Sequence, residues 1–304
     1  MYRSTGRSLA LPEKIGNAQA PQETGELLVP DLQIPTQIFR GTSKIGGATV
    51  GYTLEVPEDI IDPVPLGIVH GYTGIEQAYI GLRNYTARNG KPSFTYDTPR
   101  NLDIPWLLDP RHILFPNKLL GQAVWGTMHS IAKNKQNRVD GTVYDLAGHS
   151  MGTPTSIHLA HLKNDHVRSV MMIAGAGMED HNLVMLLTRL PGFLKEEVAP
   201  AIKQGNFCEA SRTRMIAKTA LHICSNLPRT LAEGIAVSDS DIVEKVGSLK
   251  ELNIKTGLLG FVSDSLLHTR KAFINMESIV DVARLLPGNH LGPQIFPAVT
   301  GAEL

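Results

Sequence analysis

Hydrophobic and polar residues follow two different spacings along this chain, and the order of the two predicts its fold class. Residues 37–44 and 48–57 lie on either side of a Gly-Gly pair and are typical of two antiparallel strands. Residues 65–71, PLGIVHG, are almost continuously apolar, as in a strand that is covered on both faces. The segment 1–36 is rich in Pro, Gly, Gln and Glu without a sustained period, so we expect a loosely ordered arm there.

Predicted helices and strands then alternate through the middle of the chain. The helical segments are 75–90, which ends on Gly90 as a C-cap, 117–134 and 153–164. The strand segments are 93–99, 141–148 and 167–177. Alternation at this interval predicts a mostly parallel sheet with helices on both faces.

The alternation stops between residues 178 and 252, where we find no convincing strand. The helix-like segments of this region are 182–204, 209–227 and 240–252. A connection of this length is far longer than an ordinary loop, so we expect an inserted helical lid. Strands are expected again within 254–264 and 278–288. The predicted division is an arm at 1–36, a first core part at 37–177, the lid at 178–252 and a second core part at 253–304.

Composition and charge narrow the classes of function. Of the 304 residues, 29 are basic and 29 acidic, 42% are hydrophobic and 19% are charged, as in a soluble globular protein. No basic excess indicates a nucleic-acid partner, and no run approaches the roughly 18 apolar residues of a membrane span. The first 20 residues lack the apolar segment of a secretory signal, so we expect a cytoplasmic location. Cys208 and Cys224 are interpreted as buried free thiols.

Residues 144–153, YDLAGHSMGT, place a serine in a Gly-x-Ser-x-Gly motif between a predicted strand and a predicted helix. In a nucleophile elbow the glycines leave room for close chain contacts around a tight turn that exposes the hydroxyl. Gly148 and Gly152 take these positions around Ser150. The backbone N–H of Met151 points into the same space at a helix N-terminus, which favours negative charge. This context favours a reactive serine over a serine in an ordinary turn.

A serine nucleophile needs a base to take its proton and an acid that orients the base. Such partners are expected downstream, in the order acid and then histidine. Asp264 follows the strand predicted within 254–264, and His290 lies in a loop bounded by Gly and Pro after the last predicted strand. The alternative role for Asp264 is to cap the helix that begins near Ser265.

Rival groups exist for both partners. His268 is a second candidate base, but it would lie on the first turn of a helix so close to the acid that it would reach Ser150 poorly. Glu179 and Asp180 are rival acids, because the strand that precedes them ends at the same edge of the sheet. We favour Asp264 and His290 over these alternatives.

A tetrahedral intermediate also needs a second backbone donor, and the loop after the third strand usually supplies it. The N–H of Tyr72 is the candidate, with Gly71 allowing the chain to approach the substrate closely. We expect His70 to brace this loop by hydrogen bonds without transferring a proton, and His149 to pack beside the elbow. No metal site is expected, because no three ligands lie at a telling spacing.

Over about residues 37–304 the sequence resembles the α/β-hydrolase fold, and within it the serine esterase, lipase and acyl-hydrolase branch with a helical lid. The resemblance is carried by His70-Gly71-Tyr72, Gly148-His149-Ser150-Met151-Gly152, Asp264 and Gly288-Asn289-His290-Leu291-Gly292. It implies an eight-stranded, mostly parallel sheet flanked by helices, a Ser150, Asp264 and His290 triad, oxyanion donors at Tyr72 and Met151, and no cofactor. Thr153 and Asn289 depart from the common pattern and leave the subfamily open.

The expected substrate is a small apolar acyl or ester compound, with medium-length uncharged esters as one hypothesis. The candidate substrate contacts are Gly71, His149, Met178, Met185, Leu186 and Phe193. The alternative for those in the lid is that they form the seam between lid and core. A triad determines acyl chemistry without determining the leaving group, so C–C bond, thioester, lactone and amide hydrolysis and acyl transfer stay open, as does a non-catalytic binder. The oligomeric state is also open, with a homodimer as one alternative.

Overall fold

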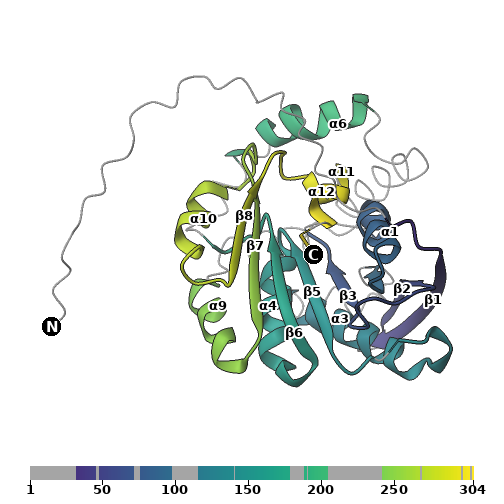
Figure 1. The fold of residues 1–304 in the computed structure, drawn as a ribbon. Coiled ribbons are helices and arrows are strands. Elements are labelled where there is room, and N and C mark those ends of the chain that lie inside the picture. The colour runs from purple at the N-terminus through teal and green to yellow at the C-terminus, as the bar shows by residue number, and fades with distance from the viewer. Residues whose placement is uncertain are drawn as a thin grey trace, which may run out of the picture.

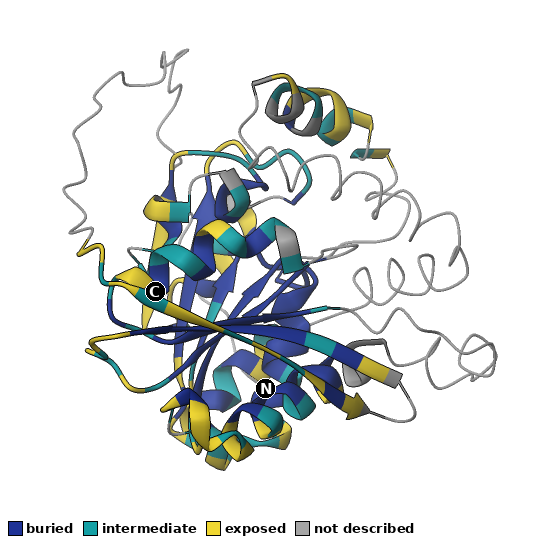
Figure 2. Ribbon diagram, turned by 90° about the vertical axis from the view of Figure 1, so that its right-hand side faces the viewer, coloured by how far each residue is buried: buried dark blue, intermediate teal, exposed yellow. Residues whose placement is uncertain are grey.

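A computed structural model of the chain describes residues 32–45, 48–71, 76–97, 116–139, 141–178, 188–189, 191–204, 242–267, 269–295, 297–301 and 303–304. These residues form a single mostly parallel sheet with helices against both of its faces (Figure 1). Figure 2, turned by 90°, shows the buried strands between two layers of helices. The layered arrangement confirms the predicted fold class.

The sheet has eight strands in the order β1-β2-β4-β3-β5-β6-β7-β8. Their bounds are Thr36–Ile45 for β1, Ala48–Pro57 for β2, Leu66–Val69 for β3, Ser93–Tyr96 for β4, Tyr144–His149 for β5, Val167–Ile173 for β6, Lys255–Phe261 for β7 and Val282–Leu286 for β8. β2 pairs antiparallel with both β1 and β4, and all other neighbouring strands pair parallel. Each of the eight segments predicted as strands overlaps one of them.

Helices occupy the connections between the strands. Their bounds are Glu76–Tyr79 for η1, Ile80–Arg88 for α1, Pro116–Lys133 for α3, Lys135–Asn137 for η3, Gly152–Leu162 for α4, Asn164–His166 for η4, Leu194–Val198 for η5, Ala199–Gln204 for α6, Val243–Leu249 for α9, Lys250–Leu252 for η6, Thr269–Met276 for α10, Gly292–Ile295 for α11 and Pro297–Gly301 for α12. Gly90 has a φ of 88° just after α1, as expected of a helix end. Among the described helices, none is both long and apolar enough to cross a membrane.

The region between β6 and β7 is described in part. Its described residues form η5, α6, α9 and η6 and contain no strand, in agreement with the helical pattern of the sequence. The predicted helix at 209–227, with Cys208 and Cys224, lies outside the described residues, as does most of the arm at 1–36. The division into core and lid stays a prediction.

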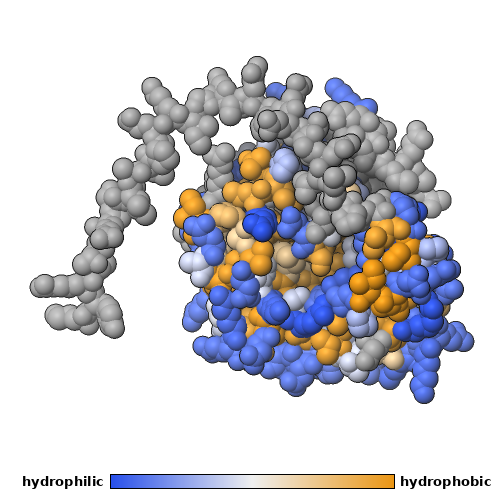
Figure 3. Space-filling model, viewed as in Figure 1, coloured by the Kyte–Doolittle hydropathy of each residue, from blue (hydrophilic) through white to orange (hydrophobic). Residues whose placement is uncertain are grey.

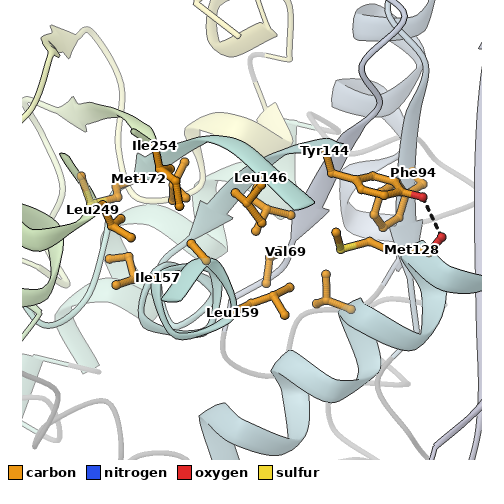
Figure 4. Packing of buried hydrophobic residues seen from close by; sticks show 14 of the residues in the cluster. Val69, Phe94, Met128, Tyr144, Leu146, Ile157, Leu159, Met172, Leu249 and Ile254 are labelled. Carbon is orange, nitrogen blue, oxygen red and sulfur yellow. Dashed lines mark hydrogen bonds between the residues drawn. The ribbon is translucent and has the colours of Figure 1, made fainter. Parts of the chain in front are cut away.

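Successive residues of the central strands point to opposite faces and therefore feed two separate hydrophobic clusters. In β5, Leu146 belongs to the cluster beneath α3, α4, α9 and α10, whereas Ala147 belongs to the cluster beneath α1. Figure 4 shows the larger cluster, where the Tyr144 hydroxyl also donates a hydrogen bond to the Met128 carbonyl oxygen at 2.6 Å. Burial on both faces is the reason that β3 is a continuous apolar run in the sequence.

The edge strand β8 differs from the central strands. Val282 and Leu285 are exposed in it, and the space-filling view in Figure 3 shows hydrophobic surface over this part of the sheet. Only Leu286, at the carboxyl end of the strand, is buried. The buried side chains that stabilise the sheet therefore belong mainly to the strands from β2 to β7. The candidate serine follows one of these strands, β5.

Asp145 lies at the amino end of β5, opposite to the end that carries Ser150, and its carboxylate is buried among cations. It accepts hydrogen bonds from Lys91 Nζ at 2.7 Å and Arg168 Nε at 3.0 Å, and from Ser169 Oγ at 2.6 Å. Burial by itself raises the pKa of Asp145, but the hydrogen bond from Arg168 and the charge of Lys91 outweigh it and lower the pKa overall.

We expect Asp145→Asn to lower the free energy of unfolding by about 2 kcal/mol near neutral pH, because an amide has one acceptor oxygen and the change removes the more deeply buried of the two carboxylates, Asp62 and Asp145, that pair with Lys91 and Arg168. Since the folded pKa of Asp145 is lowered, this stabilisation is present above the ordinary carboxylate pKa of about 4 and is lost as the pH falls through the lowered value. Urea unfolding of the wild type and of Asp145→Asn measures the difference between their free energies of unfolding. This difference should become smaller in acid. The control Asp165→Asn changes an exposed carboxylate and should leave stability unchanged. An Asp145→Asn protein as stable as wild type at neutral pH would contradict the prediction.

Candidate active site

Ser150 lies in a strained turn between β5 and α4. Its φ is +54°, in the left-handed region that residues with a side chain rarely adopt. The Ser150 N–H donates to the Ile173 carbonyl oxygen at 2.9 Å, and the Ser150 carbonyl oxygen accepts from the N–H groups of Thr153 at 3.0 Å and Ala176 at 3.2 Å. These three backbone hydrogen bonds hold the strained conformation of the turn.

The two glycines of the motif lie where chain segments meet most closely. A Cβ atom at Gly148 would stand 2.6 Å from the Gly152 carbonyl oxygen, and one at Gly152 would stand 2.8 Å from the His70 carbonyl oxygen. Both distances are shorter than real Cβ contacts, so a side chain at either position would push α4 away from β3 and β5. The glycines therefore allow the turn to be tight, as the motif predicts.

The structure brings Asp264 and His290 together from the loops after β7 and β8. The His290 Nδ1–H donates to Asp264 Oδ2 at 2.9 Å, and the Asp264 side chain has no exposed surface. Asp264 Oδ1 accepts the backbone N–H groups of Leu266 at 2.9 Å and Leu267 at 2.8 Å. The carboxylate thus binds the backbone of the following turn with one oxygen and the imidazole with the other. No helix begins at Ser265, and the catalytic role of Asp264 stays a prediction.

This pairing determines which ring nitrogen of His290 is basic. A carboxylate only accepts, so the neutral imidazole carries its proton on Nδ1 and keeps the lone pair on Nε2. Burial lowers the pKa of His290, but the charge and hydrogen bond of Asp264, together with the charge of Glu197, outweigh burial and raise the pKa above its ordinary value. His290 is therefore a stronger base than a free histidine.

His149, which precedes the serine, links three parts of the site. Its Nε2–H donates to the His290 carbonyl oxygen at 2.8 Å, because a carbonyl oxygen can only accept. Nδ1 must then accept from the Tyr79 hydroxyl at 2.6 Å. The Tyr79 oxygen in turn accepts the Gly71 N–H at 3.2 Å and the Gln294 Nε2–H at 3.3 Å. Burial lowers the pKa of His149 to about 3, so the ring is neutral and its tautomer is fixed.

These bonds occupy both ring nitrogens of His149, for which the sequence suggested a substrate contact, and the ring packs beside the elbow. His149 and His290 have ring centroids 4.9 Å apart, so the loop after β8 lies against the elbow. A Cβ at Gly71 would stand 2.9 Å from Ser150 Cβ, so the loop after β3 also reaches the elbow. His70 stacks on Tyr96 with ring centroids 4.7 Å apart, in keeping with a bracing role.

The remaining candidates fall into two groups. Met151 is buried at the start of α4, and Met178 is fully buried within the larger hydrophobic cluster, where it has no surface for a substrate. Phe193 packs edge-on against the His290 ring, with centroids 5.8 Å apart. The candidates that lie outside the described residues are Tyr72, Glu179, Asp180, Met185, Leu186 and His268.

Sequence reasoning missed Glu197, a buried carboxylate in η5. Its Oε2 accepts the His290 backbone N–H at 2.8 Å, and its Oε1 accepts the Ser265 N–H at 2.7 Å and the Ser265 hydroxyl. Burial raises the pKa of Glu197, and the hydrogen bonds from Ser265 only partly offset this. In the sequence Glu197 stands in a run of charged residues, LKEEV, which has no motif that would mark it. Tyr79 and Gln294 were missed as well, because neither stands in a motif that would mark it.

No family model matches the sequence, and no curated protein matches it. Solved structures do match its fold. A bacterial membrane phospholipase A superimposes with a TM-score of 0.63 at 13% identity, over 91% of this chain and 86% of the other. E-2-(acetamidomethylene)succinate hydrolase does so with a TM-score of 0.61 at 16% identity, over 88% and 97%. The enol-lactonase from Burkholderia xenovorans LB400 reaches 0.57 at 13% identity, over 87% and 97%.

These likenesses cover nearly the whole length of each chain, and at such low identities they concern the arrangement of the elements alone. The same arrangement was expected from the motifs at residues 70–72, 148–152 and 288–292. It follows that this chain has the α/β-hydrolase fold.

Proposed function

We propose that this protein is a serine hydrolase that cleaves a carboxylic ester or a related acyl bond. One observation carries the proposal. The strained elbow at Ser150 lies against the loop of an Asp264–His290 pair, with His149 joining the two by its hydrogen bond to the His290 carbonyl oxygen at 2.8 Å. A nucleophile, an oriented base and an acid that holds the base are the groups that acyl transfer requires.

In the proposed mechanism His290 Nε2 takes the proton of Ser150 while the serine oxygen attacks the acyl carbonyl carbon. Asp264 holds the imidazole in the required tautomer and stabilises the imidazolium that forms. The backbone N–H of Met151, at the start of α4, and that of Tyr72 stabilise the oxyanion, each donor contributing about 3 kcal/mol. His290 then protonates the leaving group and activates water, which releases the acid from Ser150.

The solved structures with the same fold support hydrolysis as the reaction class. Two of them are named as ester-cleaving enzymes, a phospholipase A and an enol-lactonase, and the third is named a hydrolase. Thioester, amide and C–C bond hydrolysis use the same groups and differ in the leaving group. Phe193, beside the His290 ring, favours an apolar acyl group in this position.

The test is to incubate the wild-type protein with a fluorophosphonate probe and map the adduct by mass spectrometry. We expect covalent labelling at Ser150 and hydrolysis of p-nitrophenyl esters, with kcat/KM highest for uncharged acyl groups of medium length. Folded protein without an adduct would refute the proposal in favour of a non-catalytic binder. Labelled protein that prefers a thioester or a β-diketone over every ester would instead assign the leaving group to one of the alternatives.

We expect Tyr79→Phe to lower the free energy of unfolding by about 1–3 kcal/mol, because the buried Gly71 N–H and His149 Nδ1 both lose their partner. It should also slow ester hydrolysis by about tenfold, since this hydroxyl ties the loop after β3 to the elbow. Urea unfolding and steady-state kinetics measure the two effects. The control Tyr52→Phe removes a hydroxyl in β2 and should leave kcat unchanged. A Tyr79→Phe protein with wild-type stability and wild-type kcat would show that the network does not position the site.

A further inference from the structure

Glu197 connects the region between β6 and β7 to both loops that carry the proposed acid and base. Its side chain is almost entirely buried, with 3% of its surface exposed. One carboxylate oxygen binds the backbone of His290 itself, and the other binds the backbone and hydroxyl of Ser265, the residue after Asp264. A single side chain from outside the sheet thus bridges the loop after β7 and the loop after β8.

A buried carboxylate is tolerated only when its oxygens are well bonded, so each of the three donors matters. Two of the donors are backbone N–H groups. Their nitrogen atoms lie 2.8 Å from Glu197 Oε2 and 2.7 Å from Glu197 Oε1, so both hydrogen bonds are short. The two loops are joined directly by the hydrogen bond from the Ser263 N–H to the Gly288 carbonyl oxygen at 2.9 Å. Two residues further along each loop, at Ser265 and His290, the Glu197 carboxylate provides the second link between them.

A second contact comes from the same segment. Phe193 and Glu197 are four residues apart and lie on one face of a helical segment. The Phe193 ring meets the His290 imidazole edge-on at 5.8 Å, while Glu197 holds the His290 backbone. In Figure 1 the helix that follows, α6, lies beyond the ends of β7 and β8 from which these two loops emerge. This short segment therefore constrains both the backbone and the ring of His290.

We propose that Glu197 is a positioning residue, which holds the Asp264 loop and the His290 loop in register so that the histidine can act as the base. This inference rests on the proposed function, in which His290 takes the proton of Ser150. It assigns to the region between β6 and β7 a part in assembling the acid–base pair, in addition to any contact with substrate.

Glu197→Gln is the decisive variant, because it preserves size while turning one acceptor oxygen into a donor that faces a backbone N–H. We expect kcat for p-nitrophenyl esters to fall by about 10- to 100-fold, since a displacement of about 1 Å in a catalytic group has an effect of this order. KM should change by less than about threefold, because substrate binding is not the target. The matched control is Glu196→Gln, which makes the same chemical change in the neighbouring exposed residue and should leave kcat and KM unchanged.

The pH profile separates positioning from a general loss of structure. The charged or titratable groups around the His290 ring are Asp264, Glu197 and the neutral His149. The negative charge of Glu197 contributes to the raised pKa of His290, so its removal should move the acidic limb of kcat/KM to lower pH. In Glu196→Gln the acidic limb of kcat/KM should lie at the same pH as in the wild type.

A readout that needs no substrate completes the test. The Nδ1 proton that His290 donates to Asp264 should give a far-downfield proton NMR resonance, which is identified by its loss in His290→Gln. We expect this resonance to shift or broaden in Glu197→Gln and to be unchanged in Glu196→Gln. If the wild type neither labels nor hydrolyses esters, the proposed function fails, and the resonance still decides whether Glu197 positions the pair.

Should Glu197→Gln fail to fold, Ser265→Ala tests the same bridge more gently, because it removes only the hydroxyl donor to Oε1. It should reduce kcat by a smaller factor and perturb the same resonance. A folded Glu197→Gln protein, or in its place a folded Ser265→Ala protein, with wild-type kcat, acidic limb and resonance would overturn the proposal.

Discussion

Replacing Ser150 by alanine, or His290 by alanine, should each lower kcat for ester hydrolysis by about a millionfold, and combining the two should lower it no further. The reason is that the hydroxyl and the imidazole act as one unit. Without the imidazole the serine proton has no acceptor, and without the hydroxyl the imidazole has no proton to take. Steady-state kinetics on the two single variants and the double variant measure this non-additivity.

Non-additivity is the informative part of this experiment, because it reports whether the elbow and the loop after β8 act at the same place. If the two losses multiplied, Ser150 and His290 would contribute independently and the proposed pairing would be wrong. Fluorophosphonate labelling should disappear in Ser150→Ala and be strongly slowed in His290→Ala. Ser248→Ala, in α9 and remote from the elbow, serves as the matched control and should keep wild-type labelling and kcat.

The second large effect is expected at Asp264, where Asp264→Asn should lower kcat by about 10,000-fold with little change in overall structure. The two backbone N–H groups of Leu266 and Leu267 require an acceptor, so the amide oxygen of asparagine takes the place of Oδ1. The NH₂ group then faces His290 Nδ1 and donates to it. The imidazole proton is displaced to Nε2, where the ring can no longer accept the proton of Ser150.

The pH dependence of Asp264→Asn provides a second check. The charge of Asp264 raises the pKa of His290 against the opposing effect of burial. Removing the charge should lower that pKa, so the residual activity should persist to lower pH than in the wild type. The comparison variant is Asp180→Asn, the rival acid from the sequence. If Asp180→Asn lost far more activity than Asp264→Asn, the assignment of the acid would be wrong.

Several features of the fold could be predicted from the sequence because their causes are local. The strand β3 is a continuous apolar run because helices cover both faces of the sheet there, so each of its residues is buried. The elbow is local as well: Gly148 and Gly152 stand within two residues of Ser150, and its φ of +54° is a property of that short turn. Each of these signals is contained within a few neighbouring residues.

The partners of the elbow were predictable by type and order, whereas their contacts were not. Asp264 and His290 were found as an acidic residue and a histidine at the carboxyl ends of predicted strands, and their 2.9 Å hydrogen bond depends on loops whose geometry no local pattern encodes. Met178 shows the converse case. Its helical spacing is the same for a substrate contact and for a core residue, and the structure places it in the core.

The sequence by itself therefore determined the sheet and the elbow and predicted the residues of the proposed acid–base pair, because each follows from short-range periodicity or from a motif of a few residues. Tertiary structure alone decided what holds these parts together. Tyr79 and Glu197 make their decisive hydrogen bonds to residues about 70 and 93 positions away along the chain. A long-range hydrogen bond leaves no periodic signature, because any polar side chain of suitable length can make it once the fold brings the two groups together.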